Sequence, residues 1–234
     1  MLSDIINGNF NIFQLVVYVI VLFTVLPFHE FAHAWTANKL GDPTATFQGR
    51  NTLNPLKHLD PFGTICILLT GFGWAKPVPV NPVNFRKVTM RTGMALTSFA
   101  GPAANLIFAV GAMILSKLAT GFAVMSYSVA ALANTLIIAA NVFYLMALVS
   151  TGLAVFNLIP IPPLDGSKIL NAVLPDRIYF KIMQYERYIF IGLMLLMVSG
   201  ALDVPLSFLR KWAFTGIDFI TGFVDIIFKA AGVY

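Results

Sequence analysis

Long runs of apolar residues, separated by polar stretches, restrict the fold of this chain more than any other feature. The first run has only Gln14 and Thr24 as polar side chains between Phe10 and Phe28. Inside a bilayer each backbone N–H and C=O must be paired within the protein, which a helix achieves and an open strand does not. The runs therefore predict membrane-spanning helices at about 10–40, 92–118, 129–159 and 188–206.

The composition supports the same class of protein. Of the 234 residues 58% are hydrophobic and 11% are charged, whereas about a quarter of a soluble domain is charged. No Lys or Arg precedes the first run, so we expect no cleaved signal peptide. We predict an all-α polytopic membrane protein, a bundle of about four transmembrane helices forming a single membrane-embedded domain over residues 1–234.

Two segments fit poorly as spans. Residues 63–85 begin with a short apolar piece and continue as "KPVPVNPVNF", where Pro77 and Pro79 disfavour a helix. This pattern predicts a short re-entrant, extended, β-like segment. Residues 212–234 place their polar side chains on one narrow stripe, which predicts an amphipathic helix lying in the membrane interface. A fifth span with its stripe packed inward is the alternative for that segment.

The basic residues predict the orientation. Eleven of the 15 Lys and Arg residues fall in 39–91 and 168–187, and none falls in 1–10 or 119–128. By the positive-inside rule the basic segments are cytoplasmic, so the N-terminus lies outside. We expect a bacterial cytoplasmic membrane protein surrounded by the lipid bilayer. The net charge of +5 is explained by this topology, and we expect no nucleic-acid partner.

Three ionisable residues follow the first apolar run in "PFHEFAHAW". In a helix His29 and His33 are one turn apart on one face and can bind one metal ion, while Glu30 can reach a water beside it. This is the His-Glu-x-x-His spacing of zinc hydrolases. The simpler alternative is a pair of histidines reaching the interface at a helix end. Ionisable groups at a membrane boundary are costly and usually functional, which favours the metal site.

A hydrolytic zinc site usually has three protein ligands. Asp165, in "NLIPIPPLDG", is the best third candidate because prolines end the third helix at the same membrane face as His29. Capping of the helix that begins at "GSKILNAVL" is the other role open to Asp165. His58 could replace it as a ligand, although a structural pairing with Asp60 is favoured.

A hydrolytic site at the membrane could act on a membrane-spanning helix only after that helix unwinds locally, and its freed backbone N–H and C=O groups would then need partners. The extended stretch Trp74–Val80 could supply them as a strand edge. Val78 has the only N–H between Pro77 and Pro79, so it is the candidate donor to the substrate. A rigid connector is the alternative role of this stretch.

The paired motifs "HEFAH" and "NLIPIPPLDG", with "GWAKPVPVNP" and "GPAAN", resemble the site-2 proteases, which cleave within membranes. The resemblance implies one Zn²⁺ per chain held by His29, His33 and Asp165, with Glu30 as general base. It also implies substrate contacts from Asn157 and Asn105. We expect a compact form: the interval between the second and third spans is too short for a PDZ domain, and no nucleotide-binding regulatory domain is expected after the fourth span.

We therefore predict an intramembrane zinc endopeptidase that cleaves the transmembrane helices of single-span membrane proteins, as in regulated intramembrane proteolysis. A metal transporter or metal sensor is the main alternative. A transporter should distribute its ligands along a path through several helices, whereas these candidates share one depth. An inactive relative that binds membrane proteins without cleaving them is the second alternative, against which the presence of Glu30 argues.

Overall fold

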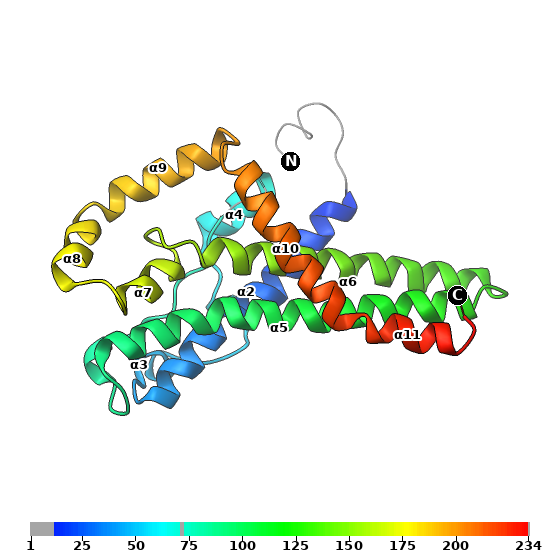
Figure 1. Ribbon diagram of the computed structural model, residues 1–234, viewed down its shortest axis with the longest axis horizontal. Coiled ribbons are helices and arrows are strands. Elements are labelled where there is room, and N and C mark those ends of the chain that lie inside the picture. The colour runs from blue at the N-terminus through cyan, green and yellow to red at the C-terminus, as the bar shows by residue number, and fades with distance from the viewer. Residues whose placement is uncertain (1–11, 71–72, 234) are drawn as a thin grey trace.

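A computed structural model describes residues 12–70 and 73–233, and all regular elements in these ranges are helical (Figure 1). The predicted all-α class is confirmed. The longer helices are α2 (Ile12–Leu40), α5 (Met90–Met125), α6 (Ala130–Asn157) and α10 (Asp203–Thr221). The shorter helices are α3 (Thr44–Phe47), η1 (Pro55–Lys57), α4 (Pro61–Thr70), η2 (Pro82–Asn84), α7 (Asp165–Asn171), α8 (Asp176–Gln184), α9 (Glu186–Val198) and α11 (Phe223–Ala230).

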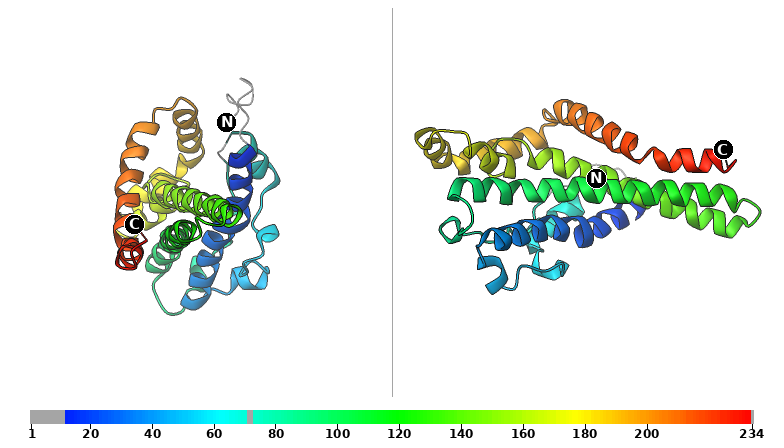
Figure 2. Two further views of the ribbon diagram at one scale, coloured as in Figure 1. Left: turned by 90° about the vertical axis from the view of Figure 1, so that its right-hand side faces the viewer. Right: turned by 60° about the horizontal axis from the view of Figure 1, so that its bottom comes forward.

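Helices α2, α5 and α6 form the centre of the molecule and are the three described helices long and apolar enough to cross a membrane. Helices α5 and α6 lie side by side as an antiparallel hairpin, and α2 crosses them obliquely (Figure 2). The contact between α5 and α6 is lined by small residues and flexible methionines, which let helix backbones approach closely, whereas α2 packs through Val17, Val21 and Val25. The buried residues between α5 and α6 are Ala109, Ala112, Met113, Met146 and Ala147, and Ile217 of α10 packs against them.

Helices long and apolar enough to be the expected second and third spans are found, with shifted ends. Helix α5 has 36 residues and continues to Met125, so most of the predicted loop 119–128 is helical. At 1.5 Å per residue it is about 54 Å long, well beyond the roughly 30 Å of a hydrocarbon core. Sequence hydropathy locates the apolar part of such a helix but not where the helix ends.

The expected fourth span over 188–206 is not found as one helix. Helix α9 ends at Val198 after 13 residues, Gly200 follows with φ +73°, and α10 starts at Asp203. A glycine in the left-handed conformation is a common helix stop, because other residues adopt it at a steric cost. About 20 residues are needed to span a bilayer, so α9 is too short to do so alone.

The predicted helix at 212–234 corresponds to the second half of α10 and to α11, with Tyr234 outside the described residues. Two carboxylates of its polar stripe reach the bundle, where Lys117 of α5 lies 2.8 Å from Asp218 and 2.6 Å from Asp225, while Asp218 itself and Lys229 are exposed. The rings of Phe122 and Phe228 also meet edge to face. The placement of this segment in the membrane interface stays a prediction.

The segment 63–85 has a helical arm, α4, and a non-helical arm. Residues 71 and 72 of the expected re-entrant turn lie outside the described residues. The second arm runs through Trp74–Asn81, which we call the strap. Within the described residues the strap makes no strand, and its β-like character is limited to one antiparallel bridge between Leu59 and Ala75. Proline at 77 and 79 removes the donors that a continuous ladder would need.

Candidate metal centre

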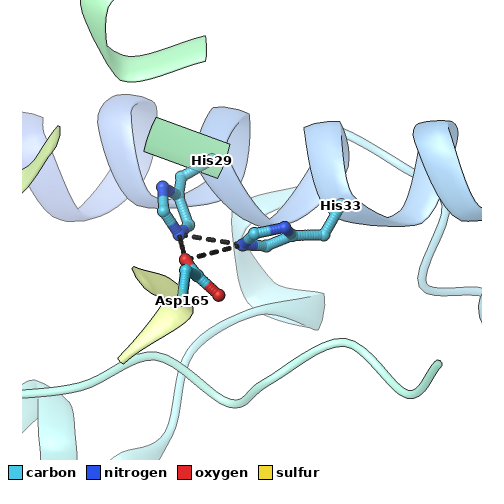
Figure 3. Close-up of side chains that lie close together, drawn as sticks. All are labelled: His29, His33 and Asp165. Atoms are coloured by element: carbon cyan, nitrogen blue, oxygen red, sulfur yellow. Dashed lines mark hydrogen bonds and ion pairs between the residues drawn. The ribbon is translucent and has the colours of Figure 1, made fainter. Parts of the chain in front are cut away.

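Three buried ligand-type side chains from two distant parts of the chain meet in the interior (Figure 3). Asp165 Oδ2 lies 3.3 Å from Nε2 of His29 and 3.2 Å from Nε2 of His33. The two Nε2 atoms are 3.0 Å apart. The structure thus brings together the two histidines and the aspartate that the sequence predicts as metal ligands.

This triangle has the size of one face of a zinc coordination tetrahedron. Zinc binds nitrogen and oxygen ligands at about 2.0–2.2 Å, so neighbouring ligand atoms of a tetrahedron are about 3.3–3.6 Å apart. The three measured separations of 3.0–3.3 Å are close to that range. Two imidazoles and one carboxylate are also a donor set typical of hydrolytic zinc sites. The residues present therefore fit a zinc ion.

Helix α2 positions both histidines and α5 supports them. His33 Nδ1 lies 2.7 Å from the Thr97 carbonyl oxygen, so Nδ1 must carry the proton and Nε2 has a free lone pair for a metal. Gly101 lies against both rings: a Cβ at that position would be 2.4 Å from His33 Nε2 and 2.6 Å from His29 Cε1. Only glycine allows α5 to approach the pair this closely.

Asp165 is the first residue of α7, not its N-cap, and no side chain caps this helix. The capping alternative is therefore wrong, and the carboxylate is directed at the histidines instead. The adjoining Gly166 packs tightly on the chain that leaves α6, since a Cβ there would be 2.3 Å from the Leu158 carbonyl oxygen. After the proline-rich turn α7 packs on α5, and its first residue, Asp165, reaches the histidines of α2.

Glu30 is buried beside the ligands and contacts the strap. Its Oε2 accepts a hydrogen bond of 3.0 Å from the Val78 N–H. Val78 is the strap donor that the sequence predicts to be available to a substrate. In this structure that donor is paired with the predicted general base, and one Glu30 oxygen remains for other partners.

Two buried charged residues hold the strap on either side of this contact. Arg50 Nη2 donates to the Lys76 carbonyl at 2.6 Å, and Asp42 Oδ2 accepts from the Asn81 N–H at 2.7 Å. Burial raises the pKa of Asp42, but hydrogen bonds from Thr44, Asn81 and Asn84 outweigh it and hold that pKa below its usual value. Asp42 therefore stays ionised near neutral pH and keeps its hold on the strap.

The other predicted residues lie outside this ligand group. The His58 ring is fully buried, and its Nε2 bonds the Thr52 carbonyl at 2.7 Å rather than Asp60, whose carboxylate accepts from the Gly63 N–H. Its role is structural, as favoured, but with a different partner. Asn157 is the last residue of α6 and donates to the Leu153 carbonyl at 3.0 Å. Asn105 is fully buried on α5.

Sequence reasoning missed Thr97, Arg50 and Asp42. Thr97 acts through its carbonyl, which every residue has, so nothing in the sequence distinguishes it. Arg50 and Asp42 look like ordinary cytoplasmic charges. Their burial and their bonds to one short segment become visible only in the fold.

Comparisons with known proteins agree on one relationship. The model of "Peptidase family M50" matches residues 17–199. A Bacillus subtilis (strain 168) protein, named "Putative zinc metalloprotease YwhC", is 42% identical over 217 residues, which are 92% of each chain. A Mycolicibacterium smegmatis protein, named "Putative zinc metalloprotease Rip2", is 30% identical over 80% of this chain and 68% of its own length. No solved structure matches this chain.

Proposed function

The chain belongs to peptidase family M50, the site-2 protease family, and from this premise we propose that it is a zinc endopeptidase cleaving transmembrane helices within the bilayer. The resemblance seen in the motifs is confirmed, and the chain is a metalloprotease. The observation that carries the intramembrane proposal is the position of the ligand triangle. Two of its three members, His29 and His33, are buried on α2, one of the three described helices apolar enough to span a membrane.

In this proposal His29, His33 and Asp165 hold the zinc ion and Glu30 is the general base. Bound zinc supplies a Lewis acid that makes water nucleophilic near neutral pH and polarises a peptide carbonyl. The Glu30 carboxylate accepts the proton of the attacking water, and the same carboxyl then returns it to the leaving amine. The Val78 N–H holds one carboxylate oxygen, so the other oxygen has a fixed direction for this proton transfer.

The substrate is proposed to be a single-span membrane protein whose helix unwinds locally at the site. A backbone amide of the unwound helix that is shielded from water and has no hydrogen-bond partner costs roughly 1–3 kcal/mol. The strap offers an extended backbone next to Glu30, with Arg50 and Asp42 fixing it on both sides. Because the Val78 N–H is held by Glu30, we assign the substrate contact of Val78 to its carbonyl, and a second contact to Asn157 at the end of α6.

Replacing Val78 with proline removes the strap donor while keeping the backbone extended. Loss of a hydrogen bond to a charged or reacting group, at about 1.5–3 kcal/mol, should lower kcat/KM by roughly 10- to 100-fold. Zinc content should not change, because Val78 is no ligand. The measurement is cleavage kinetics on a single-span substrate, with metal analysis of the same preparations.

Val80→Pro is the matched control. It adds a proline to the same strap at a position whose N–H has no hydrogen bond within residues 12–70 and 73–233. It should cleave like the wild type. Unaltered kinetics in a folded Val78→Pro protein would remove Val78 from the site.

The chain is an integral membrane protein, and we place it in a bacterial cytoplasmic membrane with its N-terminus outside and its metal site open to the cytoplasm. Membrane vesicles of both orientations, carrying a co-expressed single-span substrate, test reaction and orientation together. A membrane-permeant zinc chelator should stop cleavage in both kinds of vesicle. EDTA, which does not cross membranes, should stop it only when the cytoplasmic face is outward. Cleavage that survives the permeant chelator would refute the zinc mechanism, and the opposite EDTA pattern would invert the topology.

A further inference from the structure

Two buried polar groups near the ligand triangle have no hydrogen-bond partner among the described residues. One is Nδ1 of His29, and the other is the whole side-chain amide of Asn105, both Oδ1 and Nδ2. Asn105 is fully buried and His29 is 5% exposed. Buried polar atoms in folded proteins are nearly always paired, so an unpaired ring nitrogen and an unpaired amide in one helix contact require an explanation.

The unpaired nitrogen of His29 is the one that must carry a proton when the other binds zinc. Nε2 of His29 faces Asp165 and His33, whereas Nδ1 points away from both (Figure 3). Histidines that bind metals almost always donate their second N–H to a carbonyl, a carboxylate or a water, which fixes the ring and raises its basicity. His33 has such a partner in the Thr97 carbonyl. His29 lacks one.

The antiparallel register of α2 and α5 places Asn105 next to that nitrogen. His33 lies beside Thr97, both rings lie against Gly101, and Phe28 packs on Phe108. Asn105 is one turn beyond Gly101, on the side of His29 away from His33. Helical side chains lean towards the N-terminus of their own helix. In this antiparallel pair Asn105 and His29 therefore lean towards each other.

We propose that the Asn105 side chain is the positioning partner of His29: its amide oxygen accepts the Nδ1–H, directly or through one buried water. Asn105 then does for His29 what the Thr97 carbonyl does for His33. Gly101 leaves no side chain between them, so the amide can reach the ring from the next turn. This inference rests on the zinc site of the proposed function.

The assignment differs from the substrate contact that the sequence resemblance implies for Asn105. A residue that binds the substrate backbone must be reachable by that backbone, whereas Asn105 is fully enclosed, and its own carbonyl accepts from Ser150 of α6. A positioning role predicts an effect on zinc affinity with no substrate present. A role in substrate binding alone predicts no change in zinc affinity when no substrate is present.

The test is zinc affinity of the purified full chain, measured by competition with a fluorescent chelator. Asn105→Leu keeps the size of the side chain and removes the acceptor, so the Kd for zinc should rise about 10- to 100-fold. Asn105→Asp keeps an acceptor and strengthens it, so zinc should bind as tightly as in the wild type or more tightly. Thr151→Val, an equally buried polar-to-apolar change on α6, is the control and should leave the Kd unchanged.

An Asn105→Leu protein with a Kd within about twofold of the wild type would overturn the proposal. If this variant does not fold, the isosteric Asn105→Asp decides: weaker zinc binding than the wild type would equally overturn it. A wild-type chain that binds no zinc would instead refute the proposed function. The two failures are therefore distinguishable.

Discussion

The Glu30→Gln protein should retain about one zinc ion per chain and lose cleavage by roughly 10²- to 10⁴-fold, the usual contribution of a general base. Glutamine has the shape of glutamate but cannot take up the proton of the attacking water. Its amide oxygen can still accept the Val78 N–H, so the strap should stay in place. The measurements are single-turnover cleavage of a reconstituted single-span substrate and atomic absorption of the same sample.

Glu186→Gln, the same change at the start of α9, is the control and should cleave like the wild type. Comparing the membrane proteomes of cells with wild-type and Glu30→Gln protein would then reveal natural substrates as proteins that stay uncut in the variant. Normal cleavage by Glu30→Gln would require another base. Loss of zinc together with cleavage would make Glu30 a ligand.

Asp165→Ala should lose both zinc and cleavage. The carboxylate is one of three ligand groups, and its removal leaves two histidines, fewer than the three ligands that hydrolytic zinc sites use. The zinc Kd should rise by more than the about 10- to 100-fold expected when an outer partner of a ligand is lost. Competition with a chelator gives the Kd, and His29→Ala and His33→Ala should behave alike.

Asp203→Ala, at the exposed start of α10, removes a carboxylate from elsewhere in the chain and should not affect zinc. His58→Ala extends the comparison, because His58 is the other ligand that the sequence offers. Its ring contacts Thr52 instead of the triangle, so the variant should keep its zinc affinity once folded. Tight zinc binding by Asp165→Ala, together with weak binding by His58→Ala, would show that His58 and not Asp165 is the third ligand.

The metal centre could be predicted from the sequence because its chemistry is carried by side chains at informative spacings. His29 and His33 share a helical face, and the prolines before Asp165 predict a bent chain at the same membrane depth. The helices α2, α5 and α6 could also be predicted from the sequence, since each is a long apolar run. In these cases the residue types themselves encode the structure.

The remaining features depend on backbone groups and local geometry. The Thr97 carbonyl behind His33 and the Val78 N–H on Glu30 are groups that most residues possess, so no residue type indicates them. The interruption between α9 and α10 arises from a single positive φ at Gly200 inside an apolar stretch. A hydropathy pattern averages over that residue and predicts one continuous span.

The ion cluster of Lys117, Asp218 and Asp225 shows that the end of the family match and the end of the packed structure are different residues. The family match ends at residue 199, whereas the nearly buried ammonium of Lys117 is neutralised by Asp218 and Asp225, beyond that point. Trimming the chain to residues 17–199 would leave this cation without its counter-ions beside apolar helix surfaces, which is unfavourable. The relative that is 42% identical aligns over 92% of this chain, which must include residues beyond 199, so a fragment cut at the end of the family match would be shorter than both the aligned segment and the packed structure.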